Sequence, residues 1–238
     1  MMQIAARVSM WSGARTPCAR DYVQDGQVRR WDGIEHSLIA NEWDDLANGV
    51  KITLPPFSGN SLAFSSNALR MTTIDGGVFG QINTGYADSI ASGDFSVGAT
   101  VSFNMTTAPL GTAGICDWFG AVRPLRIGTN GSVSMFISGI GAVNLENIGG
   151  QQSYSLAIVT DRTNSKTYFY ANGELVETLN AAMAGTTTRS LRMFYCPTGG
   201  WPAGQVIDIH SAWQYSRALT ASEIARNYAI DKERFGLT

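Results

Sequence analysis

The sequence lacks a continuous apolar segment long enough to cross a membrane or to act as a secretory signal. No run of about eighteen apolar residues occurs. Where a signal peptide has its apolar stretch, Arg7, Gly13 and Arg15 interrupt the first part of the chain. We therefore expect no membrane insertion. We also expect that the protein stays where it is made, leaves as part of an assembly such as a virion, or has been trimmed.

Charge is also scarce. Only 15% of residues are Asp, Glu, Lys or Arg, and 17 basic against 19 acidic residues give a formal net charge of −2. Because nucleic-acid binding needs a concentration of basic residues, and the sequence shows no basic run, we expect no nucleic-acid partner.

Cysteine and histidine are too few for the common metal and redox motifs. The three cysteines, Cys18, Cys116 and Cys196, cannot all pair within one chain and show no C-x-x-C spacing. Two alternatives stay open: Cys116 and Cys196 form a disulfide, or they are buried thiols that act as small apolar side chains. The two histidines, His36 and His210, form no H-E-x-x-H motif, so a zinc site is not supported.

Alternating apolar residues between closely spaced turn signals dominate the chain. From Phe95 to Phe103 every second residue is apolar and the residues between are small or polar, which predicts a strand with one core face. The small polar face is compatible with an open concave surface over which a ligand or a loop lies, and exposure to solvent alone explains it equally well. A double hairpin is predicted from Tyr154 to Thr178, with Asn172-Gly173 as a two-residue turn. Roughly eleven to thirteen such short strands predict a β-sandwich or barrel.

The stretch from 206 to 236 predicts a strand that leads directly into the one helix we expect. Thr220 and Glu223 have the spacing of a capping box, so the helix should begin near Ala221, and Gly236 provides a stop. The strand's apolar residues are expected on one face: Ile207, Ile209, Trp213 and Tyr215.

The sequence contains no linker-like tract and no internal repeat, so a single main domain is expected over residues 21–238. Residues 1–20 show no regular period. They are expected to form an N-terminal arm, either an ordinary frayed lead-in or an attachment segment for a larger assembly.

Three stretches resemble laminin-G-like domains of the concanavalin A-like superfamily, of the type encoded by gut bacteria and their phages. These are DYVQDGQVRRWDGIEH (21–36), YSLAIVTDRTNSKTYFYANGELVET (154–178) and SAWQYSRALTASEIARNYAIDKERFG (211–236). The resemblance implies an all-β fold, a two-sheet antiparallel jelly-roll β-sandwich with one short C-terminal helix. It implies no single function, because this fold hosts lectins, glycan hydrolases, adhesion modules and virion structural proteins.

The residues that a hydrolase of this fold would need are missing. A retaining glycosidase places two carboxylates about 5 to 5.5 Å apart, and laminarinase-like relatives carry them as Glu-x-Asp-x-Glu on one strand. The nearest stretch here has Val206 and His210 at the two glutamate positions. Asp208 can orient His210 as the general base of a Ser-His-Asp triad, but no G-x-S-x-G motif supplies the nucleophilic serine. We therefore assign no catalytic residue.

Four aromatic residues in Gly-rich loops are candidates for ligand binding, because indole and phenol rings stack on the apolar faces of sugars. They are Trp118, Phe119, Tyr195 and Trp201. The alternative is that these rings plug the ends of the sandwich. Other tryptophans are expected in the core: Trp31, Trp43 and Trp213.

Calcium is the one cofactor that the fold suggests. Its candidate ligands are Asp88 and Asp94, which flank a predicted turn, and Asp117 in a predicted loop. No loop has the acidic density of an EF-hand, and ordinary surface turns also explain these aspartates.

Together these observations favour a non-catalytic recognition, adhesion or structural module that binds a glycan, or a protein of a cell surface or virion. A component of a phage head or tail fibre is the preferred setting, with localisation on a virion or an extracellular surface. The alternatives are a secreted or surface lectin-like domain of a gut bacterium and a glycoside hydrolase. Oligomerisation stays open, although no coiled-coil heptad is present.

Overall fold

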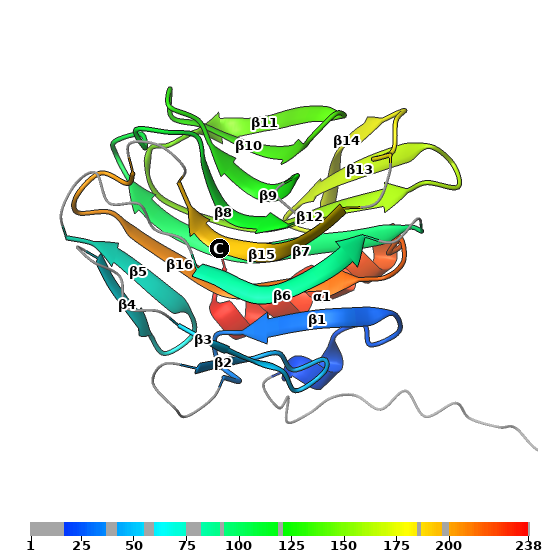
Figure 1. The fold of residues 1–238 in the computed structure, drawn as a ribbon, viewed down its shortest axis with the longest axis horizontal. Coiled ribbons are helices and arrows are strands. Elements are labelled where there is room, and N and C mark those ends of the chain that lie inside the picture. The colour runs from blue at the N-terminus through cyan, green and yellow to red at the C-terminus, as the bar shows by residue number, and fades with distance from the viewer. Residues whose placement is uncertain are drawn as a thin grey trace, which may run out of the picture.

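The computed structural model shows two layers of antiparallel sheet and one α-helix (Figure 1). It describes residues 17–36, 42–54, 60–74, 82–90, 93–118, 121–184, 187–196 and 200–237. Most of the expected N-terminal arm, residues 1–16, therefore lies outside the described residues. Its last part contains a short 3-10 helix, Ala19–Asp21.

The larger sheet has eight strands and the smaller sheet six. The main path of the larger sheet is β14 (Glu174–Leu179), β13 (Lys166–Ala171), β12 (Gly150–Asp161), β7 (Phe95–Met105), β16 (Val206–Tyr215), β5 (Leu69–Thr73) and β4 (Asn60–Phe64), and β1 (Gln27–Asp32) also pairs with β16. The smaller sheet runs β11 (Gly141–Asn147), β10 (Ser132–Ile137), β9 (Val122–Ile127), β8 (Ala113–Trp118), β15 (Thr187–Tyr195) and β6 (Ile82–Ile90). A separate hairpin joins β2 (Glu42–Asp44) to β3 (Lys51–Thr53).

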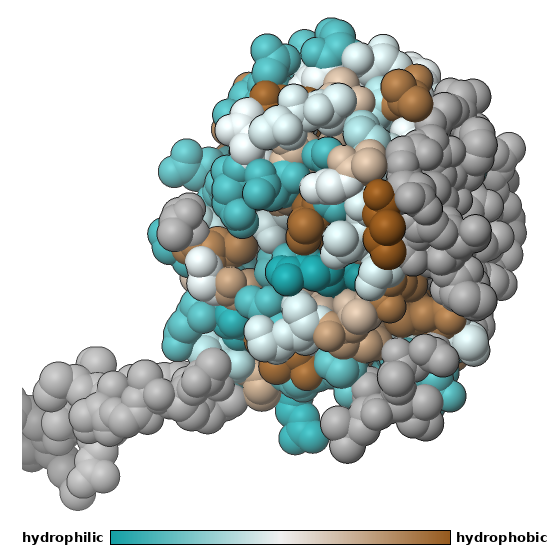
Figure 2. All heavy atoms as spheres, turned by 90° about the vertical axis from the view of Figure 1, so that its left-hand side faces the viewer, coloured by the Kyte–Doolittle hydropathy of each residue, from teal (hydrophilic) through white to brown (hydrophobic). Residues whose placement is uncertain are grey.

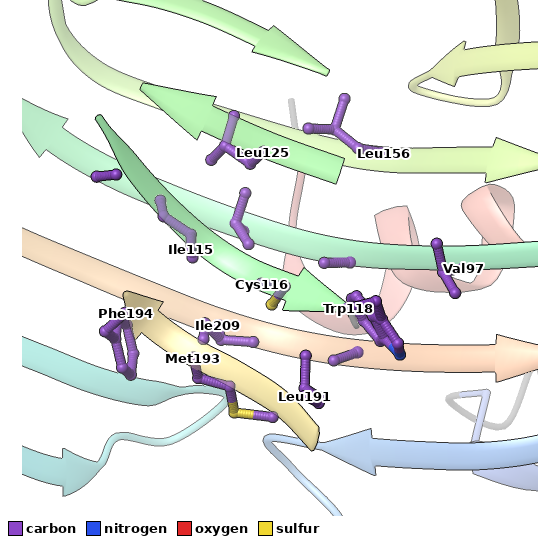
Figure 3. Close-up of a cluster of buried hydrophobic side chains, with 14 of the residues drawn as sticks. Val97, Ile115, Cys116, Trp118, Leu125, Leu156, Leu191, Met193, Phe194 and Ile209 are labelled. Atoms are coloured by element: carbon purple, nitrogen blue, oxygen red, sulfur yellow. The ribbon is translucent and has the colours of Figure 1, made fainter. Parts of the chain in front are cut away.

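The main hydrophobic core fills the space between the two sheets. The alternating apolar residues from Phe95 to Phe103 on β7 all belong to it and are at most 3% exposed. Figure 3 shows side chains of both sheets meeting in this core, among them Leu125 of β9 and Leu156 of β12. The all-β antiparallel sandwich with one short C-terminal helix is thus confirmed. The core positions of Trp31, Trp43 and Trp213 are also confirmed, since each is at most 2% exposed.

The polar face of β7 is covered. Ser96 and Thr100 are fully buried, and Ser102 is 7% exposed. The Oγ of Ser96 donates to the carbonyl of Arg217, and the Oγ1 of Thr100 donates to Asp231, so the segment after β16 and the helix lie over this face. Among the alternatives for this face, a covering segment is the one observed.

The helix α1 (Ala221–Phe235) begins and ends where the sequence predicts. The backbone N–H of Glu223 donates to the Thr220 side chain, and the Glu223 carboxylate accepts from the N–H of Thr220. Gly236 has a φ of 67° and ends the helix in the left-handed conformation. None of the helices in the described ranges has the length and apolar character needed to span a membrane.

The Asn172-Gly173 turn between β13 and β14 is also confirmed. Both residues have positive φ, 52° and 80°, as a type I′ turn requires. The sequence predicts this turn because the requirement is local to two residues.

Two sequence-based predictions are wrong. Asp117 and Trp118 do not lie in a loop, because Ala113–Trp118 form β8, which is buried on both faces and so lacks the apolar–polar alternation of a half-exposed strand. The apolar residues of β16 do not share one face. A register shift between Ile209 and Ser211 turns Trp213 and Tyr215 toward a second cluster near α1, whereas Ile207 and Ile209 point into the main core.

Two further strands have weak signals in the sequence. In β11 only Val143 is buried, so this edge strand shows almost no apolar pattern. The strand β6 reads INTGYADSI, which is largely polar. No disulfide joins the three cysteines, all of which lie among the described residues, and Cys116 and Cys196 are both buried. Burial also raises the pKa of the Cys116 thiol.

Candidate functional site

The exposed apolar residues are scattered rather than gathered into one patch. Among the described residues on the side seen in Figure 2, hydrophobic side chains form small groups separated by hydrophilic ones. The largest exposed apolar side chains lie on several different elements: Ile34, Leu46, Ile74, Leu110, Leu175 and Val176. The candidates for a functional site are therefore clusters of polar and aromatic side chains.

One such cluster lies on the outer face of the smaller sheet. On β9, Val122, Leu125 and Ile127 belong to the core, so Arg123 and Arg126 lie on the opposite face. Across the strand pair, Arg126 lies opposite Ser134 and Arg123 opposite Phe136.

Asp117 joins the neighbouring strands to this group. It lies on β8, directly opposite Arg192 of β15, and its side chain is fully buried. Its Oδ2 is 2.5 Å from a terminal nitrogen of Arg192 and 3.2 Å from Nε of Arg123. Burial raises the pKa of the Asp117 carboxyl, and the two guanidinium groups oppose that shift.

Aromatic rings hold the arginine side chains in place. The guanidinium carbon of Arg192 lies 3.7 Å from the ring centre of Tyr195, and that of Arg126 lies 4.9 Å from the ring centre of Phe136. Arg123 lies between them, 5.5 Å from Phe136 and 5.9 Å from Tyr195. Such cation–π contacts fix a long side chain while its donors stay free for hydrogen bonds.

We call these six residues the arginine–aromatic cluster: Asp117, Arg123, Arg126, Phe136, Arg192 and Tyr195. Its basic side chains outnumber its carboxylate by three to one, although the whole chain has a net charge of −2. The side chains of Arg123 and Arg192 are 17% and 21% exposed, and Arg126, Phe136 and Tyr195 are half-buried. The cluster therefore places partly exposed rings and guanidinium groups beside a buried carboxylate.

Of the four aromatic candidates, only Tyr195 lies in this cluster. Trp118 ends β8 and is 1% exposed, and Figure 3 shows its indole among the buried side chains of the core. Trp201 is fully buried, and its Nε1–H donates to the carbonyl of Phe194 at 3.0 Å. Neither indole offers a ring face to solvent, which matches the alternative that these rings fill the sandwich. Phe119 lies outside the described residues.

The three calcium candidates lie on or next to three different strands. Asp88 lies within β6, opposite Arg189, and not at a turn. The Oδ1 of Asp94 accepts the backbone N–H of Arg162 at 2.7 Å, whereas Asp117 contacts two arginines, whose positive charge disfavours a cation. In the described parts of the chain, no group of three or more His, Cys, Asp or Glu side chains could hold a metal ion.

The residues considered for a hydrolase triad make different contacts from those a triad needs. Oγ of Ser102 lies 2.9 Å from Nε2 of His210, but Nδ1 of that histidine contacts the carbonyl of Asn67. Asp208 instead accepts two hydrogen bonds from Arg70, both 2.7 Å. Burial lowers the pKa of His210, and the imidazole is 5% exposed. The observed contacts thus give a buried Ser–His pair with no orienting carboxylate.

Sequence reasoning did not find the arginines of the cluster. Arg123 and Arg126 look like the ordinary polar positions of a strand, and Arg192 is distant from them in sequence. The available signal was the spacing of two arginines within VRPLRI, next to a strand that itself was not predicted. Only the pairing of β8 with β15 and β9 brings the residues together.

Comparison with known proteins supports the fold alone. No family model and no curated protein matches the sequence. Among solved structures, a Trypanosoma rangeli sialidase in complex with 2,3-difluoro-KDN matches with a TM-score of 0.59 and 15% identity, over 98% of this chain and 36% of that one. The botulinum neurotoxin serotype D ligand binding domain in complex with N-acetylneuraminic acid matches with a TM-score of 0.62 and 12% identity, over 87% of this chain and 51% of that one. The chain thus spans about a third to a half of these proteins.

Proposed function

We propose that this chain is a non-catalytic carbohydrate-recognition module of the laminin-G-like, concanavalin A-like kind, and that it binds glycan on the outer face of its smaller sheet. The arginine–aromatic cluster is the observation that carries this proposal. Sugars combine apolar C–H faces with hydroxyl edges, and the cluster sets aromatic rings beside guanidinium donors. Hydrogen bonds from a charged donor are stronger than neutral ones, so fixed guanidinium groups suit hydroxyl and carbonyl oxygens.

The similar solved structures support the proposal in a general way. The toxin domain is described as a ligand binding domain in complex with N-acetylneuraminic acid, and the sialidase is described in complex with sialic acid and related sugars. At 12% to 15% identity, this shared fold is compatible with a sugar-binding role here but does not locate a site.

We also propose that the module acts on a virion or an extracellular surface, as a phage head or tail fibre component or as a surface lectin-like domain of a gut bacterium. The resemblance of the three sequence stretches supports this setting. Mass spectrometry of purified phage particles tests the first possibility and surface shaving of intact cells tests the second. Detection only in the soluble interior of cells would argue against both.

A glycan array tests the binding function. We expect the wild-type protein to bind a defined subset of glycans and Tyr195→Ala to weaken that binding by about tenfold or more, as loss of a central aromatic contact does at other interfaces. Tyr195→Phe keeps the ring and should bind nearly as well. Leu175→Ala, which removes an exposed apolar side chain from the larger sheet, is the matched control. An array with no bound glycan would contradict the proposal.

A further inference from the structure

Arg126 is the basic residue of the cluster that has no ionic partner. Asp117 engages both Arg123 and Arg192, whereas no carboxylate of the described residues lies within 4 Å of Arg126. Its Nε is buried and donates to no acceptor in the described structure. A buried donor without an acceptor costs free energy, and no described carboxylate balances the charge of this guanidinium group.

The two residues directly opposite Arg126 in the sheet are small. On one side Arg126 lies opposite Gly114 of β8, which has no side chain, and on the other opposite Ser134 of β10. A Cβ at Gly114 would lie 3.2 Å from Cδ of Arg123 and 3.4 Å from Cβ of Asp117, so glycine also allows these side chains to approach. Phe136 supports Arg126 at 4.9 Å. Arg126 thus lies between two small residues with the Phe136 ring beside its guanidinium group, and Tyr195 lies on the other side of Gly114.

We propose that this site binds the carboxylate of an acidic sugar residue, with Arg126 as its ionic partner and Tyr195 and Phe136 beside the sugar ring. This inference rests on the glycan-binding function proposed above. A guanidinium is planar and can donate two parallel hydrogen bonds to a carboxylate, which an ammonium group cannot do. Asp117 is then a positioning residue, because it holds Arg123 and Arg192 without reaching solvent.

The charge of the site favours one or two anionic groups over a polyanion. One of the three arginines is unpaired, and the chain as a whole carries a net charge of −2. Nucleic acids and polyacidic peptides bind surfaces that neutralise many charges at once, and a negative protein repels them at long range. The cluster, with three arginines and one aspartate, has a formal charge of +2, so a glycan with one or two carboxylates matches it better.

The experiment compares acidic oligosaccharides with their carboxyl-reduced counterparts. The probes are sialyllactose against lactose bearing a carboxyl-reduced sialic acid, and a glucuronate-containing tetrasaccharide against its reduced form, measured by calorimetry. We expect at least one acidic probe to bind about tenfold or more tightly than its reduced partner. Sulfated lactose and inorganic phosphate serve as further probes, which separate a carboxylate preference from a general preference for anions.

Two substitutions at one position test the mechanism. Arg126→Gln removes the charge and should abolish the preference for the acidic probe, whereas Arg126→Lys keeps the charge but should restore only part of it. Arg20→Gln removes the same charge at an exposed position near the N-terminal end of the described chain and should bind as the wild type does. Thermal unfolding of each variant confirms that it is folded.

The outcomes separate this inference from the proposed function. If reduced and acidic probes bind equally and Arg126→Gln has no effect, the inference fails while glycan binding stands. If sulfate, phosphate, polyglutamate or an oligonucleotide binds in preference to every sugar carboxylate, the inference also fails. If no sugar of any kind binds, the proposed function fails and the inference fails with it.

Discussion

Asp231 of α1 is expected to be the most sensitive polar position in this protein. Its side chain accepts hydrogen bonds from Tyr22, Thr100 and Ser155, and it lies 3.7 Å from a terminal nitrogen of Arg30. Arg30 is fully buried, and its guanidinium also lies over the ring of Tyr22, 3.2 Å from its centre. This one carboxylate therefore joins the helix to β7, β12, β1 and the segment before β1.

The contacts set the size of the expected effect. Removing one partner of a buried ion pair costs about 3 to 5 kcal/mol, because the other charge stays buried without compensation. Here Asp231→Ala would leave Arg30 with Asp32, at 3.7 Å, and would leave three hydroxyl groups without their acceptor. With a denaturant dependence of about 2 to 3 kcal/mol/M, the urea midpoint should fall by about 1 to 2.5 M.

Urea unfolding followed by tryptophan fluorescence measures this effect. Glu233→Ala is the matched control, because it removes a carboxylate from an exposed position of the same helix. Asp231→Asn should lose less stability than Asp231→Ala, since burial already raises the pKa of this carboxyl and an amide oxygen can still accept hydrogen bonds. The reasoning is refuted if Asp231→Ala unfolds within about 0.5 kcal/mol of Glu233→Ala, the range of ordinary surface substitutions.

Three further substitutions test the packing and the helix cap. Trp118→Ala should cost about 3 to 5 kcal/mol in urea unfolding, because it opens a cavity in the core; a loss below about 1 kcal/mol would contradict its buried position. Gly98→Ala should lower the melting temperature, since the added Cβ would lie 2.2 Å from Trp213; an unchanged melting temperature would contradict this. Hydrogen bonding to Arg217 lowers the pKa of Glu223 to about 2 from 4.5, so its contribution is present above pH 4.5 and is lost as the pH falls toward 2. Glu223→Gln should therefore be about 1 kcal/mol less stable than the wild type at pH 7 and equally stable near pH 2, and a difference that does not change with pH would argue against it.

The parts of the fold that the sequence predicts are those fixed by neighbours along the chain. The capping box of Thr220 and Glu223 places the start of α1 because both partners lie within one turn. Asn172-Gly173 predicts its hairpin because two consecutive positive φ angles suit these residues. The alternation in β7 predicts a core face because each apolar residue points the same way as the residue two positions on.

The parts that the sequence does not predict depend on pairing between distant strands. Asp117 reads as a residue of a polar loop, yet it is buried in β8 because Arg192 and Arg123 reach it from the strands on either side. In β16 the register shift at His210 changes which residues face the core, and nothing in the local pattern marks it.

The same limit applies to the site. Tyr195 and Asp117 were candidates for two different roles, a ligand contact and a calcium ligand, and the structure connects them through Arg192. The burial of Trp118 and Trp201 follows from strand pairing that loop composition cannot show. An aromatic residue next to glycine predicts exposure only if the segment really is a loop.

The two outer faces of the sandwich differ in what covers them, and this difference favours the smaller sheet as the functional face. On the larger sheet, α1 and the segment around Tyr22 bury the polar side chains of β7, and hydroxyls there are already bonded to Asp231. A ligand on that face would have to displace the helix and break the network that we expect to stabilise the fold. On the smaller sheet, α1 has no such role, and Arg126 is held in place by Phe136 without an ionic partner in the described structure. A guanidinium group that is held in place and has no carboxylate partner among the described residues can bind an anion without displacing α1, so recognition should depend on this face while folding depends on the other.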